Sequence, residues 1–148
     1  MSDVVFDIVY VGSGPGGYVG AVRAAQLGLK TAVIEKDKTF GGTCLNVGCI
    51  PSKALLESSE HYANLHHGLE NHGIKFSKLE LDLKSMLARK EKIVKDLTQG
   101  ISFLFKKNKV DVFKGFGKIT SPKTIEVTSD SGEKTTVKAK NIVIATGS

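Results

Sequence analysis

The chain has 148 residues, of which 41% are hydrophobic and 24% are charged. These proportions are typical of one globular domain that buries a core, and they exclude a disordered chain. The longest uncharged stretch, residues 8–22, is shorter than the roughly 20 apolar residues that cross a bilayer and contains five glycines and a proline. We therefore expect no membrane partner.

The net charge is +6 and the pI is about 9.3. Much of the excess lies between residues 84 and 109, in an amphipathic stretch that Glu91 and Asp96 interrupt. Mixed charge of this kind is typical of a solvated helix face. The aromatic residues Phe103 and Phe105 lie together near one end instead of alternating with basic ones. We therefore expect no nucleic-acid partner.

Residues 1–7 show no basic segment leading into an apolar run, as a secretory signal would, and no Arg-rich amphipathic stretch. This start predicts a cytoplasmic location. Cys44 and Cys49 are the two cysteines of the chain, and cysteine pairs in cytosolic proteins are usually catalytic or redox-sensing. The expected location therefore favours a chemical role for the pair.

The first elements predict a βαβ unit. Residues 6–11 are branched and aromatic and lead into a glycine turn, which indicates a strand. A helix fits residues 18–27, with Gly28 as its C-terminal cap, and residues 31–34 form a second short strand that ends at Glu35. Strand, helix and strand in about thirty residues are half of a nucleotide-binding fold with a parallel sheet.

Two helices and several short strands are predicted after this unit. The first helix extends from the segment around Cys49 to about His66, the second covers residues 81–107, and the two could pack antiparallel. Short strands are predicted at residues 110–113, 124–127 and 135–137, with a turn at residues 129–132, and a buried strand at residues 142–145. Because that strand enters a glycine turn at the last residue, we expect the chain to be part of a longer protein.

Gly12, Gly14 and Gly17 form a dinucleotide-binding motif between the first strand and the first helix. The glycines allow a tight turn, a close approach of a pyrophosphate to the backbone, and close packing of helix on strand, while the helix N-terminus attracts the phosphates. Glu35 can accept hydrogen bonds from ribose hydroxyls and repels a 2′-phosphate, so FAD or NAD is favoured over NADP. The alternatives are a structural glycine turn and an exposed strand-end carboxylate.

Cys44 and Cys49 are brought together across four residues, and Gly48 eases the bend. An adjoining helix N-terminus and Lys53 would favour the reactive thiolate. A structural zinc site needs four ligands, and the four histidines (His61, His66, His67 and His72) lack a zinc-like spacing with the pair, so they are expected to face solvent and no metal is expected. Redox chemistry is thus favoured over zinc binding or inert thiols.

Residues 41–53, Gly-Gly-Thr-Cys-Leu-Asn-Val-Gly-Cys-Ile-Pro-Ser-Lys, resemble the redox-disulfide signature of the pyridine nucleotide-disulfide oxidoreductases. In detail they resemble the dihydrolipoamide dehydrogenases, and the resemblance extends over the whole chain. It is weaker to the glutathione reductases, which usually have Lys at Ser52 and Val at Leu45 and Ile50. The chain departs from the family pattern at Tyr10, Ser13 and Gly20, which puts only the tightness of packing in doubt.

This resemblance implies that residues 1–148 form a Rossmann-like FAD-binding domain with a parallel sheet, a two-helix insertion and a small antiparallel β-meander. It implies that Cys49 faces the flavin, that Cys44 exchanges with a dithiol substrate, and that Lys53 is a cation beside the flavin ring. The implied cofactor-binding residues are Gly12, Gly14, Gly17, Glu35, Lys36, Gly42, Thr43, Cys44, Lys53, Gly117, Thr146, Gly147 and Ser148.

The resemblance further implies oxidation of dihydrolipoamide to lipoamide, with electrons passing through the Cys44–Cys49 disulfide and FAD to NAD+. The NAD-binding domain and the C-terminal dimerisation domain that the family uses, the latter with a His-Glu acid/base pair, are not within these residues. The implied partners are lipoyl domains of 2-oxo acid dehydrogenase complexes and a second copy of the enzyme. Alternatives are a sister reductase acting on glutathione or mercuric ion, and a non-catalytic flavin-binding module.

Overall fold

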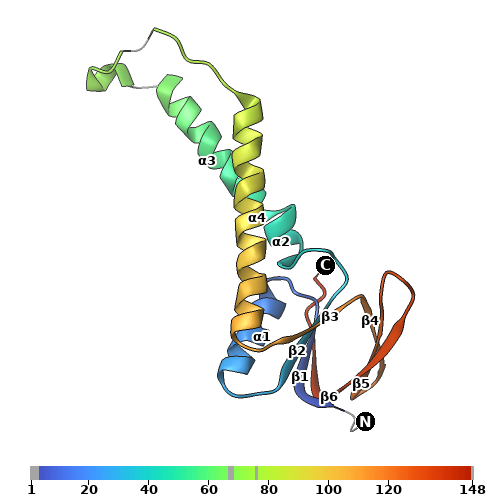
Figure 1. The fold of residues 1–148 in the computed structure, drawn as a ribbon. Coiled ribbons are helices and arrows are strands. Elements are labelled where there is room, and N and C mark those ends of the chain that lie inside the picture. The colour runs from blue at the N-terminus through green and yellow to red at the C-terminus, as the bar shows by residue number, and fades with distance from the viewer. Residues whose placement is uncertain (1–3, 67–68, 76, 148) are drawn as a thin grey trace.

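The computed structural model describes residues 4–66, 69–75 and 77–147. Within these ranges an α/β fold combines a six-stranded sheet with a layer of helices, and a helical hairpin extends away from the sheet (Figure 1). The predicted α/β class, with a Rossmann-like arrangement of the first elements, is therefore confirmed.

The first βαβ unit forms as predicted. β1 (Val5–Val11) and β2 (Thr31–Glu35) pair in parallel, and α1 (Pro15–Gln26) connects them. α1 begins at Pro15 instead of residue 18, because proline lacks an N–H and suits the first turn of a helix. Gly28 follows the helix in the left-handed region at φ +86°, as expected for a glycine that terminates a helix.

The two predicted helices after β2 are present, and a short helix that the sequence did not predict precedes them. α2 (Gly42–Asn46) and α3 (Cys49–His66) follow each other closely, and α4 (Leu83–Lys107) packs antiparallel to α3 (Figure 1). A 3-10 helix, η1 (Leu69–His72), lies in the connection. α4 begins later than residue 81 because the Asp82 carboxylate caps it, accepting a backbone N–H at 3.0 Å.

The remaining strands among the described residues are β3 (Asp111–Lys114), β4 (Phe116–Ser121), β5 (Thr124–Thr128) and β6 (Lys134–Ile144). They complete a sheet of order β3-β2-β1-β6-β5-β4. β4, β5 and β6 form the predicted antiparallel meander, and the predicted turn joins β5 to β6.

The strand predicted at residues 110–113 is present as β3, which pairs in parallel with β2. Two details of the predicted strands are wrong. β4 was not predicted, because Gly117 and the positive-φ Gly115 beside it weaken a strand pattern. The strands predicted at residues 135–137 and 142–145 are one continuous strand, β6, whose first half pairs antiparallel with β5 and whose second half pairs in parallel with β1.

The two faces of the sheet are covered differently, because successive side chains of a strand point in opposite directions. Val9 and Val11 of β1 and Ile34 of β2 belong to a buried cluster that also contains side chains of β5 and β6. Tyr10 and Val33 belong to the opposite cluster, which contains buried side chains of α1, α2 and α4. The meander therefore covers one face and the helices cover the other.

Tyr10 is accommodated by a glycine in α1. A Cβ atom at Gly20 would lie 2.6 Å from Cε1 of Tyr10, which is closer than packed carbon atoms approach. Glycine at position 20 therefore leaves room for the Tyr10 ring, and α1 packs closely on β1 at this point.

α4 is amphipathic, as predicted. Thr98, Ile101 and Phe105 are buried, the last two in the cluster that includes sheet residues, whereas the lysines of this helix other than Lys90 are exposed. Across the described ranges, the helices lack the combination of length and apolar character that a membrane span requires.

Candidate cofactor and redox site

A pocket with a volume of about 410 Å³ lies where β1, β2 and β6 end. The carboxyl ends of these parallel strands meet at one edge of the sheet, which is where α/β folds bind nucleotides. Segments that are far apart in the sequence line the pocket: residues 11–15, 34–37, 42–44, 115–117 and 145–147.

The carboxylate of Glu35 is buried at the wall of this pocket, with the residue only 5% exposed. Its Oε2 accepts from the backbone N–H of Ser13 at 2.9 Å and from the Ser13 hydroxyl, and its Oε1 accepts from the Asp37 N–H at 2.8 Å. The Gly41 N–H in turn donates to the Ser13 carbonyl at 3.0 Å. Ser13 and Glu35 therefore join the glycine turn, the end of β2 and the loop that leads to the cysteines.

The three glycines of the predicted motif are required for different reasons. A Cβ atom at Gly12, which has φ +100°, would lie 2.3 Å from the Ala145 carbonyl oxygen, and one at Gly17 would lie 2.0 Å from the Gly12 carbonyl oxygen. These two glycines are needed for packing of the protein on itself. Gly14 has an ordinary φ of −61° and lines the pocket, and a Cβ atom added to it would meet no heavy atom within 4 Å.

Gly14 is also the N-cap of α1, so no side chain there satisfies the first amides of the helix. The first turn, residues 15–18, contains no acidic residue. Free N–H groups and the helix dipole together attract an anion. Open space at Gly14, an uncapped helix end and a Glu35 carboxylate at the end of β2 fit a dinucleotide.

The segment that carries the cysteines is held by Asn46, which the sequence analysis did not single out. The Asn46 side-chain amide donates to the carbonyl oxygens of Phe40 at 3.1 Å and Gly42 at 2.8 Å, and its oxygen accepts from the Thr39 hydroxyl at 2.6 Å. An amide side chain between two cysteines is the only sequence signal for this role, since asparagine commonly bonds nearby backbone groups. It fixes the turn before Cys44.

Cys44 lies on α2 and Cys49 begins α3, and both thiols are free. A hydrogen bond with the Cys49 side chain, then burial and the charge of Cys49, raise the pKa of Cys44, while a hydrogen bond with the Cys49 backbone and the positive charge of Lys53 oppose this rise. Lys53 favours the thiolate, as expected, but its effect on Cys44 is smaller than that of the neighbouring cysteine, so the pKa of Cys44 is raised. Because Cys49 shifts the pKa of Cys44, the two cysteines are close enough to interact.

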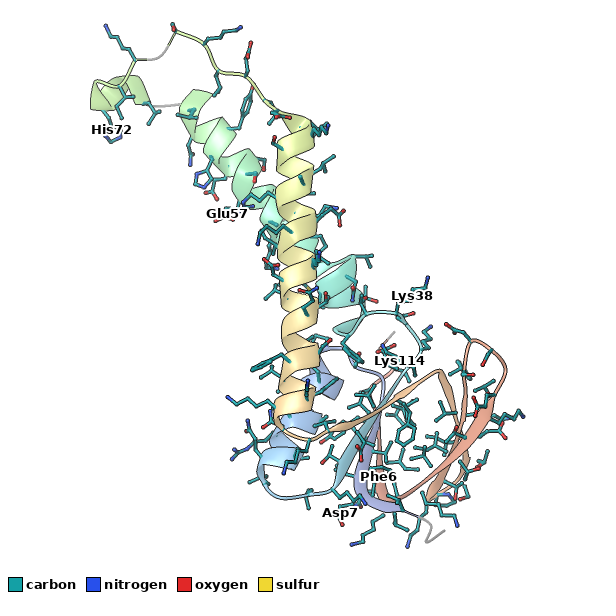
Figure 2. All side chains as sticks on the ribbon, in the orientation of Figure 1. Phe6, Asp7, Lys38, Glu57, His72 and Lys114 are labelled. Carbon is teal, nitrogen blue, oxygen red and sulfur yellow. The ribbon has the colours of Figure 1, made fainter. Side chains whose placement is uncertain are left out.

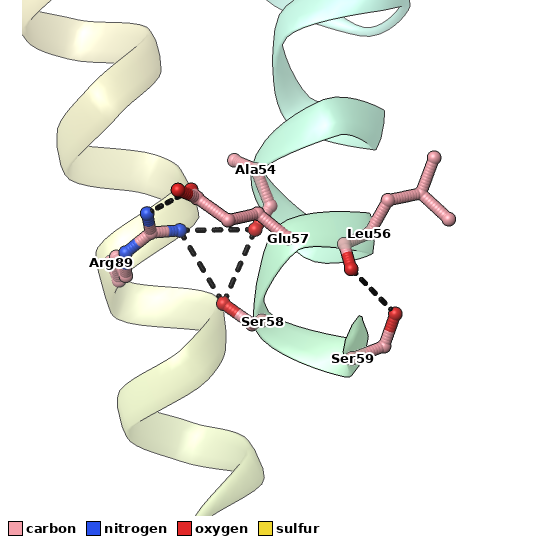
Figure 3. A network of polar contacts seen from close by, with 6 residues as sticks. All are labelled: Ala54, Leu56, Glu57, Ser58, Ser59 and Arg89. Atoms are coloured by element: carbon pink, nitrogen blue, oxygen red, sulfur yellow. Dashed lines mark hydrogen bonds and ion pairs between the residues drawn. The ribbon is translucent and has the colours of Figure 1, made fainter. Parts of the chain in front are cut away.

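Arg89 of α4 holds α3, the helix that Cys49 begins (Figure 3). Its guanidinium donates to the Ala54 carbonyl oxygen at 3.0 Å and to the Ser58 hydroxyl at 3.4 Å, and it forms an ion pair with Glu57. An arginine can make these contacts together because its planar group carries several donors. Arg89 thus joins α4 to α3 at residues 54–58.

The structure brings most of the predicted cofactor-binding residues to the pocket. Those that line it are Gly12, Gly14, Glu35, Lys36, Gly42, Thr43, Cys44, Gly117, Thr146 and Gly147. Gly17, Cys49 and Lys53 are not among the lining residues, and Ser148 lies outside the described residues.

The histidines are only partly described. His61 and His72 are exposed, as predicted, whereas the side chain of His66 and all of His67 lie outside the described part of the chain. Lining residues that the sequence analysis did not assign to the site are Val11, Ser13, Pro15, Ile34, Asp37, Gly115, Phe116 and Ala145. Proximity to the motif could have identified Ser13, but the contribution of Phe116 depends on the packing of β4.

Residues 6–148 match the model of the family described as pyridine nucleotide-disulphide oxidoreductase. Over 142 residues, 96% of this chain, the sequence is 60% identical to a leghemoglobin reductase of Glycine max and covers 27% of that protein. Over the same share of the chain it is 58% identical to a mitochondrial dihydrolipoyl dehydrogenase of Pisum sativum, of which it covers 28%. The chain therefore spans less than a third of these relatives, and the family resemblance inferred from the sequence is confirmed.

The expected cytoplasmic location is wrong. The dihydrolipoyl dehydrogenases of Pisum sativum, Arabidopsis thaliana and Dictyostelium discoideum that resemble this chain are named mitochondrial. The expectation relied on residues 1–7, and the first residues of a chain that spans 28% of such a relative carry no information about a leader. Redox chemistry at Cys44 and Cys49 is therefore supported by the signature and not by the location.

Replacing Ser13 by alanine should lower the free energy of unfolding by about 1–3 kcal/mol, because the buried Glu35 carboxylate loses its hydroxyl donor. Urea unfolding of the cofactor-free chain at pH 7 measures this. The matched control is Ser102→Ala, since the exposed Ser102 hydroxyl only contacts a carbonyl oxygen of its own helix at 3.4 Å. The control should change stability by less than about 0.5 kcal/mol, and equal losses in both variants would contradict a special role for Ser13.

Replacing Cys49 by alanine should lower the pKa of Cys44, because the hydrogen bond and the charge that raise it are removed while Lys53 remains. Only the thiolate is alkylated at an appreciable rate. The rate of iodoacetamide modification of reduced Cys44, followed on its peptide by mass spectrometry, should therefore reach half its maximum at a lower pH than in the unmodified chain. Adding Lys53→Met should shift this midpoint upward again, and an unchanged midpoint in Cys49→Ala would disprove the coupling.

Proposed function

Because the chain belongs to the pyridine nucleotide-disulphide oxidoreductase family, a family of flavin-dependent oxidoreductases, we propose that it binds FAD in the pocket where β1, β2 and β6 end. The observation that carries the proposal is Gly14. This residue lines the pocket, has an ordinary backbone conformation and has empty space where a side chain would be. The protein's own packing therefore does not require a glycine there, whereas the close approach of a diphosphate does.

In this proposal the pocket residues hold different parts of the cofactor. The first amides of α1, around Gly14, bind the diphosphate. Glu35 and Lys36 bind the adenosine ribose, and the Gly117 backbone lies at the adenine end. The residues that line the remaining path are Gly42, Thr43, Thr146 and Gly147. When bound, FAD supplies a two-electron acceptor for the reduced cysteine pair.

We propose that the cysteines exchange electrons with a dithiol substrate. One substrate thiolate attacks Cys44 of the Cys44–Cys49 disulfide, the S–S bond breaks, and its electron pair goes to Cys49. The second substrate thiolate attacks the substrate sulfur of the mixed disulfide, which closes the substrate disulfide and releases Cys44. The two protons that the substrate dithiol gives up in forming its thiolates are taken up by the cysteine pair, which then holds two electrons and two protons. The raised pKa of Cys44 supports its role as the sulfur that takes up and keeps a proton.

The proposed substrate is dihydrolipoamide on the lipoyl domains of 2-oxo acid dehydrogenase complexes, with NAD+ as the final acceptor and a homodimer as the working enzyme. The dihydrolipoyl dehydrogenase relatives at 58% identity support this choice. Residues 1–148 contain one dinucleotide glycine motif, so the proposal assigns NAD+ binding to a part of the enzyme outside them. The leghemoglobin reductases at 59–60% identity favour a second candidate, reduction of a ferric heme protein.

The FAD site can be tested with a Gly14→Ala variant of this chain. It should weaken FAD binding by at least about tenfold, because the new methyl group occupies the space of the diphosphate, while stability without FAD changes by less than about 0.5 kcal/mol. Flavin fluorescence titration and urea unfolding measure the two quantities. Gly16→Ala is the control, since Gly16 also has open space for a Cβ but does not line the pocket. Equal FAD affinities in both variants would argue against this site.

The proposed reaction can be tested in a chimera, with this chain replacing the matching 142 residues of the Pisum sativum dihydrolipoyl dehydrogenase. The chimera should reduce NAD+ with dihydrolipoamide, and Cys44→Ser or Cys49→Ser should remove that turnover because disulfide exchange needs both sulfurs. Glutathione disulfide with NADPH, and ferric leghemoglobin with NADH, are assayed in parallel. Faster turnover of either would favour the corresponding alternative, and full activity of the serine variants would disprove the thiol mechanism.

A further inference from the structure

The geometry points to Lys114 as a positioning residue for the cofactor: its ammonium holds the loop of residues 36–41 against the pocket. The inference deepens the proposed FAD site and depends on it for its functional meaning. Neither the glycine motif nor the cysteine signature contains Lys114, which is the last residue of β3 and does not line the pocket.

The Lys114 ammonium makes contacts along the length of this loop. Its Nζ donates to the carbonyl oxygens of Asp37 at 2.8 Å and Lys38 at 3.2 Å, and it lies 3.8 Å from the centroid of the Phe40 ring. Figure 2 labels Lys114 and Lys38 beside each other near the top of the sheet. Hydrogen bonds from a charged donor and a cation over an aromatic face are among the stronger polar contacts in proteins.

The loop that Lys114 holds connects the two halves of the pocket. It begins after Glu35 and ends before Gly42, and both of these residues line the pocket, as do Lys36 and Asp37. A shift of the loop would therefore move the proposed ribose-binding wall and the start of α2 together.

Two further contacts, one on each side of Lys114, also fix the position of the loop. The next residue, Gly115, donates its N–H to the Glu35 carbonyl oxygen at 2.9 Å. Beyond the ammonium, the Phe40 ring packs edge-on against Phe105 of α4 with centroids 5.1 Å apart. The loop thus lies between the end of β3 and α4. Lys114 makes the polar contacts with it, and Phe105 makes the apolar contact.

The surroundings of Lys114 favour a local role. Although the residue is exposed overall, burial lowers its pKa, and the negative charges of Glu35 and Asp37 partly oppose this, so its ammonium end is the less hydrated part. Both hydrogen bonds of the ammonium are exposed, so water can replace it at the two carbonyl oxygens, and exposed substitutions usually change global stability little. We therefore expect the Lys114→Met variant to fold and to lose only the contacts between residue 114 and the loop.

Hydrogen exchange in the cofactor-free chain tests the hold directly. The amides of Asp37 and Gly41 are hydrogen-bonded to Glu35 and Ser13, so their exchange reports on the loop. In Lys114→Met both should exchange about tenfold faster, the size expected for the loss of hydrogen bonds from a charged donor. Lys114→Arg should restore slow exchange. The control Lys140→Met removes the Lys140–Asp7 ion pair and should leave these two amides unchanged.

FAD affinity, measured by flavin fluorescence on the same variants, tests the functional meaning. Lys114→Met should weaken FAD binding about tenfold, while Lys114→Arg and Lys140→Met stay close to the unmodified chain. If the unmodified chain does not bind FAD, the proposed function fails, and the exchange data still decide whether Lys114 holds the loop. Unchanged exchange in Lys114→Met, or faster exchange with unchanged FAD affinity, would overturn the inference.

Discussion

The buried carboxylate of Glu35 is the constraint on which the rest of the site depends. Burying a charge is unfavourable unless hydrogen bonds replace the lost water, and here donors from Ser13 and Asp37 do so. Because these donors belong to the glycine turn and to the loop after β2, satisfying one carboxylate fixes both segments. The Gly41 N–H, bonded to the Ser13 carbonyl, extends the same constraint to the segment that carries the cysteines.

The strand β6 determines the shape of the opposite wall. Its second half lies beside β1 and directs Thr146 and Gly147 to the pocket, while its first half belongs to the meander that covers one face of the sheet. The meander also brings Gly117 of β4 to the pocket, where a Cβ atom would lie 3.0 Å from Ile34 Cγ2. Because β6 pairs in parallel with β1 and antiparallel with β5, the same strand stabilises the core and sets the geometry of the pocket.

The cysteines lie where two helices meet, and this junction is supported from several directions. Asn46 fixes the turn before Cys44, and Arg89 holds α3. The hydrogen bond with Cys49 raises the pKa of Cys44. The neighbouring cysteine therefore affects the protonation of Cys44 more than Lys53 does. Two cysteines that interact in the reduced state suit two-electron exchange through a disulfide.

The sequence by itself determined the βαβ start, the dinucleotide motif, the amphipathic α4 and the cysteine pair. These features are local, since each depends on periodicity or on spacing within about thirty residues. Only the tertiary structure decided that β3 joins β2, that β6 is one strand, and that Ser13 and Lys114 hold the loop of residues 36–41. The contacts of Lys114 cross 76 and 77 residues, and no local pattern specifies which distant backbone oxygens an ammonium group will meet.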